Sequence, residues 1–382
     1  MTDIKIPYTL EQVNNSASRE LFTVISTFAG GGGSSTGYKL SGGKILAFNE
    51  FVEEAITTYL SNYPNTPHID GDIKGITGDD FLKLTNLQVG ELDIFDGSPP
   101  CSAFSAIALK ELGWNKTRTY SDKKKVTNIE DLFLEYIRIA NDIQPKVMVA
   151  ENVSGLLVGA SFMKFIQFLN AIEKNGYTAT YFEMNAKDYG TSQSRGRVFI
   201  VAVRNDVMEY LDIDQINLHS LLIPNKQAYI PLHSILHDIV NDVEEVELLK
   251  AMIQRNKTIV KYANALPHNA STFKGAGDLD KSINPTGHYF NLYRSSPYTY
   301  CPILTAKGQQ LTQSGVLHYN EDRKFTIVEL KRIMGLPDDY QLTGTFNQKA
   351  ERIGRMVAPL CISALIDKVY EHILKPYNLG IK

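Results

Sequence analysis

The residue best suited to chemistry in this sequence is a cysteine that directly follows two prolines. Cys101 stands in IFDGSPPCSAFSA (94–106), after a short apolar run. Prolines form a stiff turn that would hold the thiol in one place, whereas a cysteine used for packing usually sits within a helix or strand. Glu151, in AENVSG, and the arginines of QSRGR (193–197) also follow or border apolar runs. A thiol, a carboxylate and guanidinium groups brought together would suit nucleophilic attack on an electrophilic ring.

A glycine-rich turn indicates a second candidate site, which would bind a cofactor. FAGGGG (28–33) follows an apolar run, and glycines there let the backbone approach a ligand beside the start of a helix. Glu50 ends the next apolar run, where a carboxylate can hydrogen-bond a ribose diol, and Asp72 in GDI ends the next connection. Alone, the turn could be merely flexible. With an acid about twenty residues further on, it favours a cofactor that contains adenosine.

The elements that must position these groups alternate between strand and helix patterns. Strands are predicted within 21–30, 44–50, 91–101, 145–153, 178–186 and 197–204, and helices within 53–63, 130–143 and 162–177. Such alternation predicts a parallel, doubly wound α/β sheet with helices on both faces. Ligands of these sheets bind at the carboxyl ends of the strands. Cys101, Glu151 and QSRGR would therefore converge on one crevice.

The chain is long enough for more than one domain. We expect a catalytic and cofactor-binding domain over 1–205 and a smaller, loop-rich domain over 206–290, where Gly, Ser and Asn accumulate. Helical periodicity returns over 323–340 and 347–374 in the C-terminal segment, 291–382. The last helix, 347–374, is expected to pack back onto the first domain.

Composition narrows the class of protein. The 382 residues are 43% hydrophobic and 21% charged, with a net charge of −3. Three scattered cysteines are too few for a disulfide framework or a zinc cluster, so we expect no bound metal and a reducing, cytoplasmic setting. No apolar run is long enough to cross a bilayer, so no membrane partner is expected. A nucleic-acid partner would have to meet a locally basic face.

Together, and in this order, the motifs resemble those of the DNA cytosine-C5 methyltransferases over nearly the whole chain. FAGGGG resembles the cofactor loop, FNE the ribose acid, GSPPCSAFS the nucleophile loop, ENV the catalytic glutamate motif and QSRGR the paired-arginine motif. RKFTIVELKRIMGLPDDY resembles the segment after the target-recognition domain, which would be 206–290, and ERIGRMVAP the closing cofactor motif. The resemblance implies a Rossmann-like class I sheet and S-adenosyl-L-methionine as cofactor. The cofactor contacts that it implies come from Phe28, Ala29, Gly30, Gly32, Gly33, Glu50, Asp72, Ile73, Pro99 and Arg355.

The resemblance also implies a mechanism. Cys101 would add to C6 of cytosine, and Glu151 would hold N3 and the exocyclic amine. Arg197 would contact O2, and Arg195 would support the loop. C5 would then attack the carbon on the cofactor sulfonium, and loss of the C5 proton would expel Cys101. A base inside a duplex is out of reach, so the cytosine must be flipped out.

The partner implied is double-stranded DNA, bound by a monomer in a bacterial or phage-infected cell. The segment after the nucleophile is basic, and we expect it to close over DNA and neutralise phosphates. Sequence specificity would come from 206–290. The basic residues proposed to contact DNA are Lys116, Arg118, Lys123, Lys124 and Lys125.

One position departs from the family pattern and leaves the transferred group open. The closing motif normally reads Gly-Asn, with the Asn near the transferred methyl, and this chain has Arg355 there. A guanidinium 4 Å from a sulfonium is repelled by about 4 kcal/mol at intermediate dielectric. Arg355 could turn to a DNA phosphate or to the methionine carboxylate of the cofactor. It could instead bind the extra carboxylate of carboxy-S-adenosyl-L-methionine, and the product would be 5-carboxymethylcytosine.

Two further classes of protein compete with a DNA methyltransferase. An RNA cytosine methyltransferase uses similar motifs but generally has a compact recognition region, so the long insert at 206–290 favours DNA. A non-catalytic DNA-binding relative would be expected to lack the cysteine or the glutamate, and this chain has both Cys101 and Glu151.

Overall fold

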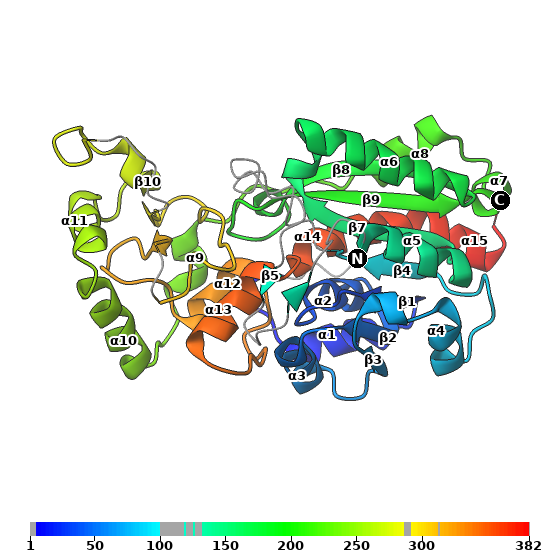
Figure 1. Ribbon diagram of the computed structural model, residues 1–382, viewed down its shortest axis with the longest axis horizontal. Coiled ribbons are helices and arrows are strands. Elements are labelled where there is room, and N and C mark those ends of the chain that lie inside the picture. The colour runs from blue at the N-terminus through cyan, green and yellow to red at the C-terminus, as the bar shows by residue number, and fades with distance from the viewer. Residues whose placement is uncertain are drawn as a thin grey trace.

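The computed structural model describes residues 5–99, 118–119, 125–126, 132–285, 292–311 and 314–381. These form two lobes, a larger one around a central sheet and a smaller one of helices and short strands (Figure 1). Cys101, Lys116, Lys123 and Lys124 lie outside the described residues. Arg118 lies in β5 (Arg118–Thr119) and Lys125 in β6 (Lys125–Val126), two short strands that pair antiparallel.

The described part of the large lobe contains a seven-stranded sheet with the order β3-β2-β1-β4-β7-β9-β8. This order reverses between β1 and β4, so the doubly wound fold predicted from the sequence is confirmed. The strands are β1 (Phe22–Thr27), β2 (Gly43–Glu50), β3 (His68–Asp70), β4 (Ile94–Gly97), β7 (Val147–Val153), β8 (Tyr177–Asn185) and β9 (Gly196–Arg204).

One strand departs from the parallel sheet that the alternation predicted. β9 runs antiparallel to both β7 and β8, with Tyr177 opposite Arg204 and Asn185 opposite Gly196. β9 is therefore the exception to the parallel direction that the alternation predicted. The reason is the connection between β8 and β9, residues 186–195, which contains only one short 3₁₀ turn. A parallel crossover needs a dozen or more residues, usually with a helix, so this segment can only return the chain antiparallel.

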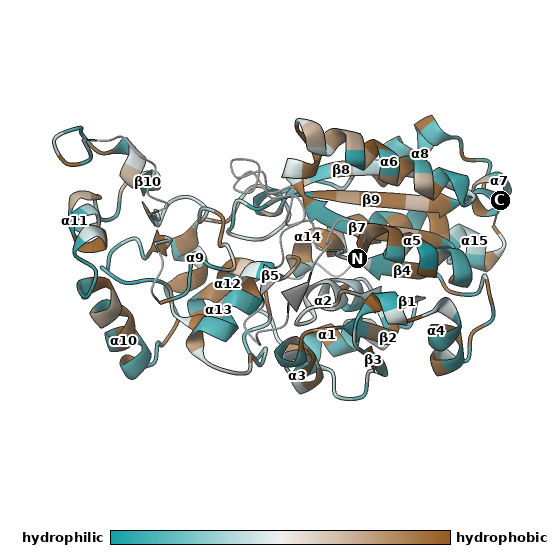
Figure 2. Ribbon diagram, in the orientation of Figure 1, coloured by the Kyte–Doolittle hydropathy of each residue, from teal (hydrophilic) through white to brown (hydrophobic). Residues whose placement is uncertain are grey.

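Alternate side chains of each strand face two different helical layers. In β9, Phe199, Val201 and Val203 belong to one core, and the residues between them belong to the other. Figure 2 shows β9 hydrophobic along its length, as expected for a strand covered on both faces. One layer contains α1 (Leu10–Ala17), α2 (Gly33–Leu40), α3 (Glu53–Asn62), α7 (Asn205–Tyr210), α8 (Gln215–Leu222) and α14 (Pro359–Val369). The other contains α4 (Gly78–Thr85), α5 (Leu132–Ile143) and α6 (Ala160–Lys174).

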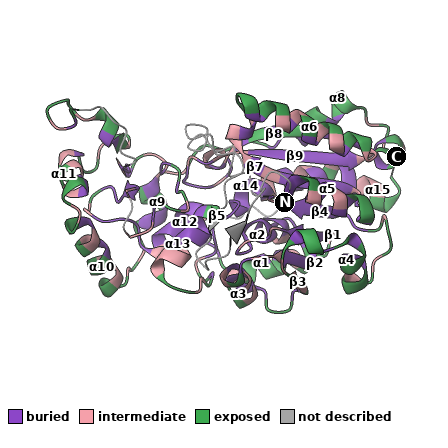
Figure 3. Ribbon diagram, in the orientation of Figure 1, coloured by how far each residue is buried: buried purple, intermediate pink, exposed green. Residues whose placement is uncertain are grey.

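The small lobe is built from 231–355, with a small apolar core of its own that includes Ile253, Ile259 and Leu317. Figure 3 shows α12 buried, whereas α10 and α11 are largely exposed. Its helices are α9 (Leu232–Leu236), α10 (Val243–Gln254), α11 (Lys257–Ala265), α12 (Ile327–Met334) and α13 (Phe346–Arg355). Its sheet consists of β10 (Lys274–Gly275), β11 (Tyr293–Arg294) and β12 (Val316–Leu317).

The C-terminal helix predicted over 347–374 is interrupted, which corrects that prediction. α13 ends at Arg355, and α14 begins at Pro359, whose ring suits the first turn of a helix. The chain continues through a π-helical turn (Tyr370–Leu374) into α15 (Lys375–Leu379). α14 packs on α2, where the Ser41 and Ser363 hydroxyls are 2.9 Å apart. The interruption lets the chain leave the small lobe and return to the sheet.

Candidate active site at the carboxyl edge of the sheet

The polar groups singled out in the sequence gather at one edge of the sheet. The glycine-rich loop follows β1, Glu50 ends β2, Pro99 follows β4, and Glu151 lies near the end of β7. These strands are parallel, so their carboxyl ends share an edge. β9 runs the other way, and its first residues, including Arg197, lie at that same edge. The antiparallel strand is therefore what brings the arginine segment to the site.

Glu151 and Arg197 form an ion pair across two neighbouring strands. The Arg197 Nε lies 2.8 Å from the Glu151 Oε1, and both side chains are largely buried, at 13% and 12% exposed. Val153 stands opposite Arg197 and Phe199 opposite Glu151, so the pair is a diagonal contact on one face of the sheet. A carboxylate and a guanidinium fixed side by side can present an acceptor and donors to a planar polar ligand.

Asn152 ties the end of β7 to the proline turn. Its Nδ2 donates to the Pro99 carbonyl at 3.4 Å, and its Oδ1 accepts from the Val153 backbone N–H at 2.8 Å. The side chain is almost fully buried. This contact fixes the Pro99 backbone at the end of β7, one residue after Glu151.

Arg195, two residues before Arg197, connects the two lobes. Its guanidinium donates to the carbonyls of Leu304 at 3.3 Å and Gly354 at 3.1 Å. Burial, and then the nearby charge of Arg197, lower the pKa of Arg195 to about 9. Gly354 packs closely on the loop of residues 304–309, and a Cβ added to Gly354 would lie 2.5 Å from the Ala306 backbone N. Arg195 thus holds together the start of β9, the 304–309 loop and the end of α13.

Glu50 organises the glycine-rich loop through backbone hydrogen bonds. Its Oε2 accepts from the Gly30 N–H at 2.7 Å, and its Oε1 accepts from the Phe51 and Val52 N–H groups at 2.8 Å. The loop is left-handed at Phe28, Gly30 and Gly32, with φ values of 52°, 55° and 94°. Ala29 is buried, and its N–H donates to Asn49.

The closing motif ERIGRMVAP packs directly on this loop. A Cβ added to Gly33 would lie 2.5 Å from the Val357 carbonyl oxygen. One added to Gly31 would lie 2.5 Å from the Met356 Cε and 2.9 Å from the Arg352 Cγ. Tyr340 also donates its hydroxyl to the Gly31 carbonyl. Glycine is required at Gly33 because the Val357 backbone approaches so closely, whereas a side chain at Gly31 would displace the flexible side chains of Met356 and Arg352.

Asp72 and Ile73 lie beside Glu50, because β3 pairs with β2 and the Gly71 N–H donates to the Glu50 carbonyl. Asp72 is exposed, and its Oδ1 accepts from the Lys74 N–H at 3.1 Å. Ile73 is buried. Asp72 therefore presents an exposed carboxylate next to Glu50, whereas Ile73 is covered by its neighbours.

Arg355, at the end of α13, is paired with an acid one turn earlier. Its Nε and one terminal nitrogen lie 2.9 Å and 2.8 Å from the Glu351 Oε1. The Arg355 side chain is 36% exposed, whereas Glu351 is 8% exposed. Glu351 therefore partly neutralises the guanidinium whose charge made this position unusual in the sequence.

The sequence analysis missed Asp96, a fully buried carboxylate in β4. Ser26, Ser34 and Tyr38 donate their hydroxyls to it at 2.6, 3.0 and 3.0 Å. Burial raises the pKa of Asp96 to about 6, and these hydrogen bonds oppose the rise. The group ties β1 and the first turn of α2 to the strand that leads into the proline turn. An acid inside the apolar run IFDG was the available signal, because a buried acid requires partners.

Comparison with known proteins identifies the family. The sequence profile described as C-5 cytosine-specific DNA methylase matches residues 22–371. The chain belongs to this family. Type II methyltransferase M.Eco47II of Escherichia coli is 30% identical over 369 residues, which cover 94% of this chain and 81% of that protein. Type II methyltransferase M.FnuDI of Fusobacterium nucleatum is 34% identical over 357 residues, which cover 90% of this methylase and 93% of its relative.

Solved structures share the fold of this methylase. A protein described as a DNA modification methyltransferase encoded within an Escherichia coli prophage superposes with a TM-score of 0.66 at 20% identity, covering 93% of this chain and 99% of that one. A mutant of Spodoptera frugiperda DNMT2 superposes with a TM-score of 0.62 at 17% identity, covering 91% and 99%. Among the residues described in this methylase, none of the helices has the length and apolarity needed to span a membrane.

Proposed function

We propose that this methylase transfers a methyl group from S-adenosyl-L-methionine to C5 of a cytosine flipped out of duplex DNA. The carrying observation is the Glu151–Arg197 pair at the sheet edge, next to the Asn152 contact that anchors the proline turn. This arrangement offers a cytosine an acceptor and donors beside the backbone that leads to Cys101. Membership of the DNA methylase family supports DNA as the substrate.

The residues at the glycine-rich loop fit the cofactor. The left-handed loop exposes backbone without side chains at Gly30 and Gly32, which lets a ligand approach closely. Glu50 uses three of the roughly four acceptor sites of a carboxylate for backbone N–H groups, which leaves capacity for a ribose hydroxyl. Asp72 and Ile73 would meet the adenine. When bound, the cofactor supplies an electrophilic methyl group on a sulfonium.

The chain's own residues would activate the base. The Cys101 thiolate adds to C6, and the electron pair displaced from the C5–C6 double bond makes C5 nucleophilic. Glu151, positioned by Arg197 and protonated on one oxygen, would donate that proton to N3 and accept from the exocyclic amine, which neutralises the negative charge that develops in the ring. After transfer, the C5 proton passes to water, the double bond re-forms, Cys101 leaves as a thiolate, and N3 returns its proton to Glu151. Flipping is required because these contacts use edges that pairing and stacking conceal.

A mechanism-based trap tests this function. A mixed-sequence duplex library in which 5-fluorodeoxycytidine replaces deoxycytidine should form a covalent adduct in the presence of S-adenosyl-L-methionine, because fluorine cannot leave C5 as a proton does. The adduct should be absent with Cys101→Ala. No adduct on any duplex would contradict the proposal. An adduct on 5-fluorocytidine RNA alone would favour an RNA methyltransferase, and binding without an adduct would favour a non-catalytic relative.

A second candidate for the transferred group is carboxymethyl, favoured by the replacement of Asn with Arg355. The Glu351 contact weakens this argument, since it reduces the repulsion that Arg355 would exert on a sulfonium. Reaction with S-adenosyl-L-methionine and its carboxy derivative in competition, followed by mass spectrometry of nucleosides, separates the two products. 5-Carboxymethylcytosine that disappears with Arg355→Asn would establish this candidate. Methylcytosine alone, with donor preference unchanged by Arg355→Asn, would eliminate it.

We also infer that 206–290 carries base recognition and that the basic segment after Cys101 contacts phosphates. Within 206–222, α7 and α8 pack on the sheet, so recognition is expected from the loops that follow them. The protein would act as a monomer in the cytoplasm of a bacterial or phage-infected cell. Exchange of 223–290 with the matching segment of a relative, followed by sequencing of modified sites, tests this assignment.

A further inference from the structure

A buried arginine beside the glycine-rich loop has no polar partner within the described part of the chain. Arg352, on α13, is only 5% exposed. Its guanidinium makes neither a hydrogen bond nor an ion pair with any residue in the described ranges, whereas Arg355 on the same helix is paired. A buried guanidinium without a hydrogen-bonded acceptor is costly, by several kcal/mol after relaxation, and nearby carboxylates offset only part of that cost. Such a group is expected where a ligand supplies the missing partner.

Arg352 lies against the glycine-rich loop that is proposed to bind the cofactor. Its Cγ and Cδ would lie 2.9 and 3.1 Å from a Cβ on Gly31, so the side chain covers the FAGGGG turn. The charged groups around it are Glu50, Glu54, Glu351 and Arg355. Burial lowers the pKa of Arg352, and the attraction of Glu50 opposes that shift most strongly.

We propose that Arg352 binds the α-carboxylate of the cofactor's amino-acid part. This inference takes from the proposed function only that the cofactor is an S-adenosyl compound. The adenosine part of an S-adenosyl cofactor is uncharged at neutral pH, and its amino-acid part carries one carboxylate. That carboxylate is the anion such a ligand offers, and a guanidinium binds it through two parallel hydrogen bonds. Glu50 and Glu54 would balance the cationic ammonium and sulfonium of the same ligand.

The rival explanation is structural. The Glu54 Oε2 is buried and lacks a hydrogen bond within the described residues, while its Oε1 accepts from Gln348 at 2.9 Å. Arg352 could serve this carboxylate electrostatically and position Glu50 without touching the cofactor. In that case its loss would affect every adenosine ligand equally.

Two ligands that differ by one group separate these explanations. S-adenosylhomocysteine and S-adenosyl-3-thiopropylamine, which is the same molecule without the carboxylate, are titrated calorimetrically into the whole protein without DNA. We expect Arg352→Gln to lower the affinity for S-adenosylhomocysteine by roughly 10- to 100-fold. The affinity for the decarboxylated ligand should stay within about twofold of that of the unmodified protein. Arg352→Lys should recover part of the loss. Arg255→Gln, at an exposed arginine after α10, is the control and should preserve the preference for the carboxylate.

Equal weakening of both ligands by Arg352→Gln, reproduced by Glu54→Gln, would overturn the proposal in favour of the structural role. Unchanged binding of both would also overturn it. Thermal unfolding of each unliganded variant checks that the fold persists, and Arg352→Met provides a second test if the Gln variant unfolds. Because no DNA is present, failure of the cytosine reaction would leave this result standing, and failure here would leave the cytosine reaction untouched.

Discussion

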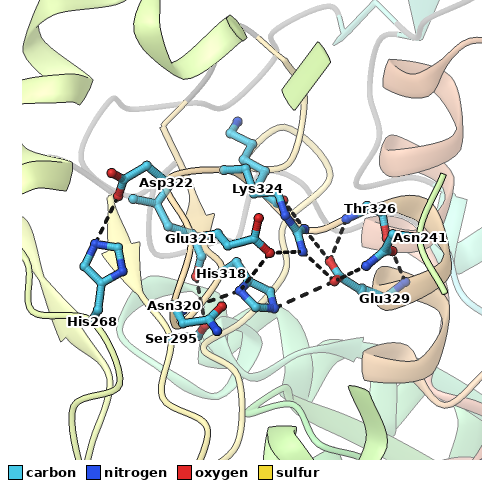
Figure 4. A network of polar contacts seen from close by, with 12 residues as sticks. Asn241, His268, Ser295, His318, Asn320, Glu321, Asp322, Lys324, Thr326 and Glu329 are labelled. Atoms are coloured by element: carbon cyan, nitrogen blue, oxygen red, sulfur yellow. Dashed lines mark hydrogen bonds and ion pairs between the residues drawn. The ribbon is translucent and has the colours of Figure 1, made fainter. Parts of the chain in front are cut away.

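Each of the two lobes is stabilised internally by a different kind of interaction. The large lobe has a sheet whose alternate side chains enter two apolar layers, with the buried acid Asp96 held by three hydroxyl groups. The small lobe buries a network of charges, in which Glu329, Glu321 and His318 lie close together (Figure 4). Apolar layers tolerate modest repacking, whereas a buried charge network requires every partner.

The charge network substitutes for regular structure in the small lobe. Arg294 is fully buried and donates to four backbone carbonyls, including those of Ala263 and Leu266 at 2.9 and 3.1 Å. Lys324 donates to the carbonyls of Gly308 and Gln310, and burial lowers its pKa to about 7. Long side chains thus satisfy loop carbonyls that a sheet would pair. The comparison implies that the cytosine chemistry depends on the sheet edge, whereas the small lobe depends on its buried charges in addition to its apolar core for stability.

The largest expected effect is at the sheet edge. Cys101→Ala should abolish turnover and leave S-adenosylhomocysteine affinity nearly intact, because the thiol touches the base and not the cofactor. Radiolabel transfer and calorimetry measure the two quantities. Cys361→Ala, a buried cysteine in α14, is the control and should retain transfer. Transfer above a few per cent in Cys101→Ala would contradict the mechanism.

The next largest effect is expected from removing a buried negative charge in the small lobe. Glu329 accepts from both terminal nitrogens of Arg323 at 2.7 and 2.8 Å and is 2% exposed. Glu329→Gln should lower the free energy of unfolding by about 3–5 kcal/mol, because it leaves Arg323 with less compensation. Denaturant unfolding measures the loss, and the exposed Glu244→Gln is the control. A loss below about 1 kcal/mol would contradict the dependence on this network.

The two lobes should respond to pH in opposite directions. Burial raises the pKa of Asp96 to about 6, so the native state holds a proton that the unfolded chain releases, and stability falls as pH rises from about 4 to 6. Burial lowers the pKa of His318 to about 4, so its contribution is complete above about 6.5 and is lost as pH falls towards 4. Each contributes up to about 3 kcal/mol.

Unfolding curves of single variants separate the two contributions. Asp96→Asn should make the free energy of unfolding rise more steeply as pH increases from about 4 to 6, because the falling contribution of Asp96 is removed. His318→Gln should make it rise less steeply over the same range, or fall, because the rising contribution of His318 is removed. Identical profiles for both variants and the unmodified protein would show that neither group titrates in this way.

A smaller effect is expected from the base-binding carboxylate. Glu151→Gln should reduce the transfer rate by roughly 10²-fold or more, since an amide cannot transfer a proton to N3 as negative charge develops in the ring. Cofactor affinity should not change. Single-turnover transfer measures the rate, and the exposed Glu173→Gln on α6 is the control. An unchanged rate would mean that the base pocket lies elsewhere.

The smallest and most diffuse effect is expected from the basic segment. Charge reversal at Lys123, Lys124 and Lys125 should weaken DNA binding and reduce its dependence on salt, while the modified sequence stays the same. Fluorescence anisotropy over a range of salt concentrations measures the slope. A changed recognition sequence would show that the segment reads bases.

Much of the large lobe follows from local patterns in the sequence. The strand at 22–27, the helix at 53–62 and the helix at 160–174 with Gly176 after it all lie where periodicity and turn residues predicted. Glycines in FAGGGG and the acid at Glu50 likewise predicted a tight turn with a carboxylate nearby. These features are local, because side-chain period and glycine conformation act within a few residues.

Contacts between distant segments were decided only by the tertiary structure. The Glu151–Arg197 pair depends on the antiparallel direction of β9, and the short connection of 186–195 was the overlooked signal for it. Nothing in ERIGRMVAP distinguishes Arg352 from Arg355 by type, yet one is buried over Gly31 and the other pairs with Glu351. Sequence by itself determined most of the strands and helices of the large lobe, the order of the motifs and the family resemblance. Long-range packing, which local propensity does not encode, decides which charged side chains pair within the described residues and leaves Arg352 without a polar partner there.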